Sequence, residues 1–247
     1  MISTVFSTLR LAVNASKTNL MLFRTRGPPP TIFPDVCWED RVLILVEQVT
    51  CLGVALDSSL TWNFHLSSCR NKLSSSVFCI YRLRRLGFPR SILIRVFKLL
   101  FMSSLMYCIA VWGSASPSLL NSLQVCQNNA IRAVFGLPHR SSVAHILKNL
   151  SVLNVSSCSK YRIACLAFLG LRRALPPSLT CTLRPVTSVR RHSPLDLLRP
   201  RYRTVFATRS PLSRIPSVWN SLPDTIRSVT DLNKFKRLLK AHFISCQ

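Results

Sequence analysis

SPSLLNSLQVCQNNAIRAVFGLP, residues 116–138, is the part of this chain with the clearest helix signals. Ser116 is a residue type that commonly caps the amino terminus of a helix, and the proline after it fits the first helical position. Gly136 and Pro138 are typical of a helix end. Between these signals, apolar residues recur every three or four positions: Leu119, Leu123, Cys126, Ala130 and Val134. The stretch therefore predicts a helix with one buried face.

The helical period continues on both sides of this segment. Upstream, one apolar stripe consists of Leu66, Cys69, Leu73, Val77, Ile80 and Leu83. A second helix is expected from about Ser91 to Trp112, and another follows over about 156–174. We therefore predict a packed bundle of about four helices over residues 61–175.

The flanking sequences have a different character. Residues 20–23 and 41–46 are apolar runs that predict strands, the second of them buried, and residues 49–57 predict another strand in which Gly53 marks a bulge or a close approach. Residues 176–216 scatter prolines through Arg- and Ser-rich sequence, which indicates a loop or docking arm, and a terminal helix follows. The expected fold class is α+β, mostly α. Its three parts are a short antiparallel strand fragment (1–58), a helical domain (59–175), and a basic Pro/Arg-rich arm with a C-terminal helix (176–247).

The charge of the chain limits its possible functions. It has 33 Lys and Arg against 8 Asp and Glu, a formal charge of +25. No acid lies between Asp57 and Asp196, whereas residues 58–195 carry 18 Lys and Arg. Such a surplus indicates a polyanionic partner, either nucleic acid or an anionic membrane, and argues against an ordinary metabolic enzyme. A disordered basic tail is excluded because 48% of the residues are apolar.

Cysteine usage and hydropathy bear on the compartment. The ten cysteines include no C-x-x-C pair and lie mostly in apolar runs, so they predict small buried side chains rather than disulfides or zinc ligands. With no signal peptide evident, we expect a nuclear or cytoplasmic protein that is not secreted. The apolar segment 99–112 is shorter than the roughly 20 residues of a membrane span. It predicts a buried helix, and peripheral membrane binding is kept as a weaker alternative.

Several short strings then coincide in one order along the chain. They are NASKT at 14–18, CLGVALD at 51–57, LTWNFH at 60–65, YCIAVWG at 107–113, QNNAIR at 127–132, VWNSLP at 218–223 and FK at 235–236. This series resembles the carboxy-terminal part of reverse transcriptases from jockey-like non-LTR (LINE) retrotransposons. The likeness covers residues from about 9 to 244.

The resemblance assigns a place to each part. The string with Lys17 and Thr18 is similar to the last palm motif before the primer-gripping hairpin, and residues 52–54 are similar to that hairpin. The helical domain resembles the thumb, which clamps template and primer, and residues 219–223 resemble the tail after it. The resemblance thus implies RNA or an RNA–DNA hybrid as the partner, held through its phosphates.

Candidate binding residues follow from these patterns. Gln124, Asn128 and Arg132 recur every fourth residue opposite the apolar stripe of their helix. The basic runs at 82–85 and 172–173 would ordinarily be solvated charge, but the lack of nearby acids favours phosphate contact. Trp112 and Trp219 are expected to be core or docking aromatics. The predicted nucleic-acid-binding set is Lys17, Gly53, Arg82, Arg84, Arg85, Gln124, Asn128, Arg132, Arg172 and Arg173.

Catalysis is where the chain departs from the family. The family's catalytic Asp pair precedes the Lys-Thr string, and residues 1–13 here contain no acid. Two-metal nucleotidyl transfer needs clustered carboxylates, and the adjacent pair Glu39-Asp40 has no third acid with a convincing place beside it. Asp57 is expected to be a strand-end cap. We therefore predict no catalytic residue and no metal or cofactor in this part, with Mg²⁺ belonging to the complete enzyme by resemblance.

The predicted function is that of a reverse transcriptase fragment from a truncated element or partial gene, which binds template–primer nucleic acid and is inactive alone. Whether the chain counts as an enzyme is left open, and its oligomeric state is not predicted. The alternative is a repurposed, non-catalytic nucleic-acid-binding or interaction protein.

Overall fold

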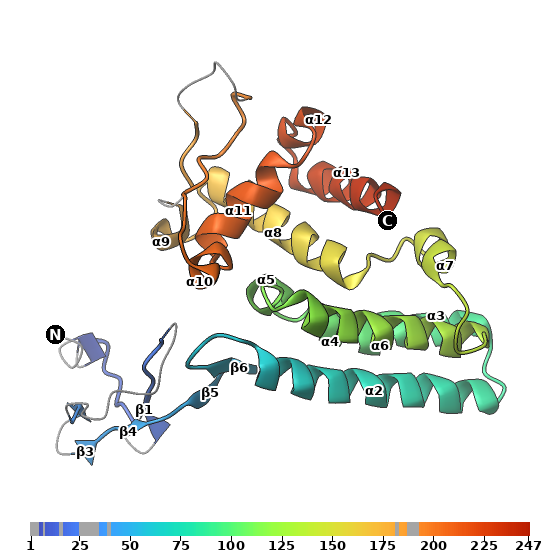
Figure 1. The fold of residues 1–247 in the computed structure, drawn as a ribbon, viewed down its shortest axis with the longest axis horizontal. Helices are drawn as coiled ribbons and strands as arrows, with labels where there is room; N and C mark the ends of the chain where they lie inside the picture. Colours follow the sequence, from blue (N-terminus) through green and yellow to red (C-terminus); the bar gives the residue numbers. More distant parts are fainter. Residues whose placement is uncertain are drawn as a thin grey trace. The chain divides into compact units, whose positions relative to one another are not determined.

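The structure is a computed structural model, and the chain divides into two compact units, Met1–His65 and Leu66–Gln247 (Figure 1). The residues that the structure describes are 5–6, 8–14, 17–24, 35–38, 41–180, 183–186 and 193–247.

A β-hairpin is the most regular element of the first unit. Strands β5 (Gln48–Cys51) and β6 (Val54–Asp57) pair antiparallel, with Cys51 opposite Val54. The two residues of the turn, Leu52 and Gly53, have φ angles of 47° and 76°, and positive φ at both positions defines a type I′ turn. The expectation of one strand with a bulge at Gly53 is therefore wrong. The chain reverses there because glycine tolerates the left-handed conformation that a two-residue turn requires.

Two smaller strand pairs complete the described part of this unit. Strand β1 (Asn19–Leu20) pairs parallel with β4 (Ile44–Leu45), and β2 (Cys37–Trp38) pairs antiparallel with β3 (Arg41–Val42). The prediction of a buried strand over 41–46 is wrong, because Val42 is 57% and Ile44 is 70% exposed. Each of these strand pairs is only two residues long. Such short pairs do not form a sheet that another layer could cover, so the apolar run stays exposed.

The junction between β6 and the first long helix is fixed by a carboxylate. Asp57 accepts hydrogen bonds from the backbone N–H groups of Ser59, Thr61 and Trp62 at 3.2, 2.9 and 2.9 Å. Helix α2 (Asn63–Arg85) begins immediately afterwards. The prediction that Asp57 is a strand-end cap is confirmed.

Helices make up the second unit up to residue 171, as predicted. After α2 come α3 (Arg90–Val96), a π-helical segment η2 (Phe97–Met102) and α4 (Ser103–Met106). Then follow α5 (Ile109–Trp112), α6 (Pro117–Phe135), α7 (Ala144–Asn149) and α8 (Val155–Leu171). The fold class, α+β and mostly α, is confirmed.

The signals at the ends of α6 act as expected. Ser116 Oγ accepts a hydrogen bond from the Leu119 N–H, and Gly136 ends the helix with a φ of 69°. By contrast, the expected continuous helix from 91 to 112 is interrupted, because Cys108 adopts a φ of 50°. The Trp112 indole N–H donates to the Tyr107 carbonyl at 2.7 Å and so stabilises the break.

The C-terminal segment is more helical than its prolines suggest. It contains α9 (Pro177–Thr180), α10 (Val205–Thr208), α11 (Pro211–Asn220), α12 (Asp224–Arg227) and α13 (Leu232–Ser245). The prediction of a loop over 211–216 is wrong. Pro211 occupies the first turn of α11, where no N–H is needed, whereas Pro216 lies inside the helix and leaves it without one i→i−4 hydrogen bond.

Helix α8 is the centre on which α11 and α13 pack (Figure 1). Phe235 of α13 stacks on Phe168 of α8 with ring centroids 4.3 Å apart, and Trp219 of α11 lies 6.0 Å from Phe235. Trp112 and Trp219 are 0% and 2% exposed, which confirms them as core residues. The three-part division of the chain stays a prediction.

Hydropathy of the helices bears on the membrane alternative. Within the part of the chain that the structure describes, no helix is long and apolar enough to cross a bilayer.

Candidate nucleic-acid interface

The carboxy-terminal turn of α2 gathers three of the predicted binding residues, Arg82, Arg84 and Arg85. Aromatic rings, not carboxylates, lie against them. The Arg82 guanidinium is 5.8 Å from the Phe78 ring centroid, and those of Arg84 and Arg85 are 5.7 and 5.8 Å from Tyr81. Cation–π contacts of this kind leave the guanidinium N–H groups able to donate to an anion.

A groove runs beside this cluster, between α2 and the end of α6. Its cavity is about 400 Å³, and its lining includes Phe78, Tyr81, Arg84, Arg132 and His139. Phe78 and Tyr81 are 61% and 42% exposed. We call this feature the α2–α6 groove. Sequence analysis missed its aromatic residues, although their positions off the apolar stripe of α2 and next to arginines could have indicated a solvent-facing role.

Arg84 lies at the edge of the groove, and its guanidinium lies against the glycine that ends α6. A Cβ atom at Gly136 would collide with Arg84 Nη1. Gly136 therefore both provides the left-handed end of α6 and leaves room for the tip of the Arg84 side chain.

The polar row of α6 lies on one face, as predicted, but the structure uses much of it internally. Gln124 Nε2 donates to Asn128 Oδ1 at 2.9 Å, and Gln124 Oε1 accepts from the Val155 N–H at 2.9 Å. The Val155 N–H belongs to the first turn of α8, which has no acceptor inside its own helix. The Gln124 side chain therefore caps α8.

Arg132 is also engaged in holding the fold. Its Nε and Nη2 donate to the Ser141 carbonyl at 3.0 and 2.9 Å, and Nη1 donates to Asn129 Oδ1 at 2.9 Å. Gln124, Asn128 and Arg132 together line a cavity of about 570 Å³. Contact of these three residues with nucleic acid stays a prediction. Their hydrogen bonds within the protein already explain in part why polar side chains recur at every fourth position of α6.

The two arginines at the end of α8 separate. Arg172 lies 3.6 Å from the Phe168 ring centroid and donates to the Val229 carbonyl at 2.6 Å, and desolvation lowers its pKa. It thus ties α8 to the segment before α13. Arg173 is exposed with a φ of 54°, so the structure does not bring the pair together as one phosphate contact.

The first unit holds the other two predicted residues. Lys17 is exposed, and its backbone N–H donates to the Asn14 carbonyl at 3.1 Å. Gly53 lies in the hairpin turn beside Leu52, which is 85% exposed.

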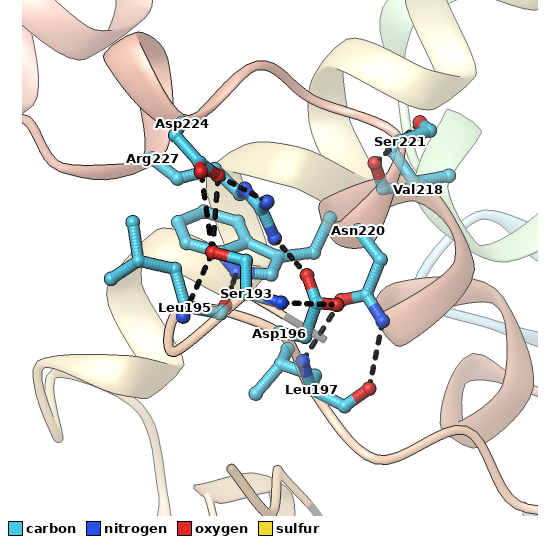
Figure 2. A network of polar contacts seen from close by, with 10 residues as sticks. Ser193, Leu195, Asp196, Leu197, Val218, Asn220, Ser221, Asp224 and Arg227 are labelled. Atoms are coloured by element: carbon cyan, nitrogen blue, oxygen red, sulfur yellow. Dashed lines mark hydrogen bonds and ion pairs between the residues drawn. The ribbon is translucent and has the colours of Figure 1, made fainter. Parts of the chain in front are cut away.

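Residues of the Trp-Asn-Ser-Leu-Pro string make polar contacts with the segment around Leu197, and Figure 2 shows those of Asn220. The Trp219 indole donates to the Leu195 carbonyl at 2.9 Å. The Asn220 side chain accepts from the Leu197 N–H at 2.9 Å and donates to the Leu197 carbonyl at 2.8 Å, like a neighbouring strand. Buried Arg227 forms ion pairs with Asp196 and Asp224. The string and Arg227 therefore hold residues 195–197 against α11 and α12.

A half-buried cation that could not be recognised from the sequence joins three helices. Arg214 of α11 donates to the carbonyls of Ala110 and Gly113, each at 3.0 Å, and to Ser159 Oγ at 2.7 Å. Desolvation lowers the pKa of Arg214 to about 10. No local pattern in the sequence distinguishes it from the surface arginines.

Among the residues that the structure describes, no three His, Cys, Asp or Glu side chains come together. Glu39 and Asp40, the acid pair noted in the sequence, lie outside the described residues.

Comparison with known proteins gives relatives of one kind, all from Drosophila melanogaster. The chain is 26% identical over 212 residues to the probable RNA-directed DNA polymerase from transposon X-element, covering 83% of this chain and 22% of that protein. It is 28% identical over 150 residues to the probable RNA-directed DNA polymerase from transposon BS, covering 57% and 16%. Over 145 residues it is 26% identical to the RNA-directed DNA polymerase from mobile element jockey, covering 57% and 15%.

The matched region therefore spans about a fifth or less of each relative's length. No family model matches the chain. No solved structure matches it either.

Proposed function

Because the chain is similar to the RNA-directed DNA polymerases of jockey-like non-LTR retrotransposons, we propose that it is a reverse transcriptase fragment that binds template–primer nucleic acid through its helical unit. The α2–α6 groove is the proposed contact surface, and the compartment is the nucleus or cytoplasm. The chain holds nucleic acid without itself carrying the polymerisation chemistry.

The observation that carries this proposal is the combination of groove and charge. Three arginines at the end of α2 stand over aromatic rings with no carboxylate paired to them among the described residues. Residues 58–195 contain no acid at all. Arginine N–H groups suit phosphate oxygens, and exposed aromatic rings suit unstacked bases at the end of a strand.

Fluorescence anisotropy with a labelled RNA–DNA hybrid across a salt series tests the binding. Each phosphate that a cation neutralises releases counterions, so five to eight contacts give a slope of log K against log[salt] of about −4 to −7. Replacing Arg82, Arg84 and Arg85 together by Gln should flatten the slope by about two to three units.

A matched control separates this surface from net charge. Arg199, Arg201 and Arg203 are exposed and lie outside the α2–α6 groove, and their replacement by Gln removes the same three charges. We expect that control to change the slope by less than about one unit. An equal change in both triple variants would overturn the groove as the interface, and a flat salt response of the parent would overturn nucleic-acid binding.

Primer extension tests the absence of chemistry. We expect the purified chain not to extend an RNA-primed or DNA-primed template with Mg²⁺ or Mn²⁺, because nucleotidyl transfer needs two metal ions held by clustered carboxylates. Template-dependent incorporation that Glu39→Ala or Asp40→Ala abolishes would contradict this part of the proposal.

A further inference from the structure

Another hollow lies in the helical unit, formed by helices other than α2. Its cavity is about 410 Å³, and we call it the α13 pocket. Four cations from three separate elements line it: Lys98 of η2, Arg162 of α8, and Lys236 and Lys240 of α13.

These four cations have no carboxylate in their surroundings. The segments that line the pocket, within residues 98–162 and 236–240, contain no Asp or Glu. No ion pair or side-chain hydrogen bond engages any of the four among the described residues. Bringing four like charges around one hollow costs free energy unless an anion is shared between them.

The position of Lys236 is fixed by its neighbour in the core. Phe235 is 0% exposed and stacks between Phe168 and Trp219, so this turn of α13 cannot rotate without breaking that stack. Lys240 lies one turn further on the same helix face. In the Phe-Lys string, Phe235 is therefore held in the core while the next residue, Lys236, lines the pocket. Neither residue lines the α2–α6 groove.

Most of the remaining lining is apolar or aromatic, with Ser151 and Cys158 besides. Met102 and Met106 form one part, Tyr161 another, and Val152 and Leu153 are buried beneath. A pocket of this volume with a cationic side and an apolar side suits a ligand that has both a phosphate and a planar or aliphatic portion. A bare inorganic anion would leave the apolar side without a contact.

We propose that the α13 pocket binds a nucleotide, with its phosphate on Lys236, Lys240, Arg162 and Lys98 and its base or sugar against the methionines and Tyr161. The nucleotide can be free or part of a nucleic-acid strand, since the recognised chemistry is the same. Nucleotide binding at the α13 pocket does not depend on the α2–α6 groove. An experiment can therefore disprove one of the two binding sites without disproving the other.

The test uses the full chain and two fluorescent probes, a labelled ATP and a labelled 12-nucleotide oligodeoxythymidylate. The pocket variant is Lys236→Gln with Lys240→Gln. The matched control is Lys234→Gln with Arg237→Gln, which removes the same charge from the same helix at exposed positions outside the pocket. Without ligand, neither variant should have a urea midpoint below that of the parent, because removing like charges relieves repulsion.

We expect the pocket variant to lose at least about tenfold in affinity and the control less than about twofold, because contact with phosphate is stronger than screened charge at a distance. A loss with labelled ATP identifies free nucleotide as a ligand, and a loss with the oligonucleotide alone identifies a strand. Equal losses in both variants, or no binding of either probe by the parent, would overturn the proposal. Inorganic tripolyphosphate that competes as strongly as unlabelled ATP would overturn the nucleotide assignment. Hybrid binding by the α2 arginine variant is a separate readout that decides the proposed function.

Discussion

Replacement of Asn220 by alanine tests whether the Trp-Asn-Ser-Leu-Pro string stabilises the fold by holding the segment around Leu197 against α11. The Asn220 amide makes two hydrogen bonds to the backbone of Leu197, which is 1% exposed (Figure 2). Removing the amide leaves a buried N–H and a buried carbonyl without these partners. Each such loss costs about 1–2 kcal/mol, so we expect Asn220→Ala to lower the free energy of unfolding by about 2–4 kcal/mol.

Urea denaturation followed by far-ultraviolet circular dichroism measures this loss. With a slope of about 2 kcal/mol per molar urea, the midpoint should fall by roughly 1–2 M. Ser221→Ala is the matched control. Its hydroxyl donates to the Val218 carbonyl at 2.7 Å in an exposed setting, so its midpoint should shift by less than about 0.3 M.

A second variant separates hydrogen bonding from packing. Asn220→Asp keeps the size of the side chain but replaces the donor that faces the Leu197 carbonyl by an acceptor, and it adds a charge near Asp196. We expect it to destabilise at least as much as alanine. An Asn220→Asp midpoint equal to the parent's, or an alanine variant no weaker than Ser221→Ala, would refute the role given to these two bonds.

Three further changes probe other parts of the chain. Leu52→Asn should raise the stability of the first unit by about 1 kcal/mol in urea, because asparagine tolerates the positive φ of a type I′ turn better than leucine; no gain would argue against that turn. Burial raises the pKa of the Cys158 thiol to about 12, so at pH 8 roughly one thiol in ten thousand is ionised. Iodoacetamide with mass spectrometry should therefore label exposed Cys51 rapidly and Cys158 only after unfolding or as the pH approaches 12, and equal rates in the folded chain would contradict its burial. Trp112→Ala should cost about 3–5 kcal/mol of unfolding free energy, whereas an unchanged denaturant midpoint would place the indole outside the core.

Features that depend on neighbouring residues could be predicted from the sequence. The ends of α6 were predicted because Ser116 and Gly136 act on the backbone within one turn of themselves. The buried stripe of α2 followed from its period, and Leu73 and Ile80 are both 0% exposed. The cap at Asp57 also followed from a local pattern.

Features that depend on distant partners could not. The polar row of α6 looks like a solvated face until α8 is placed, and then Gln124 is seen to satisfy the N–H of Val155, 31 positions away. Arg214 resembles any surface arginine, yet its acceptors lie 101 and 104 positions upstream. The strand run around Ile44 has the composition of a buried strand, but burial requires a covering layer that composition does not supply.

The few acids of the chain explain why its charge faces outward. Asp57 and Asp231 accept backbone N–H groups at the starts of α2 and α13, and Asp196 and Asp224 are committed to Arg227. Glu47 accepts from the Ser58 hydroxyl and pairs with Arg24, and these contacts lower its pKa. Carboxylates used in this way hold local structure and neutralise few cations, so most of the net +25 remains on the surface. Self-repulsion of that size opposes the compact state, and an external polyanion relieves it. A ligand that binds the folded chain in this way also stabilises it, which couples the folding of the helical unit to the nucleic acid that we propose it holds.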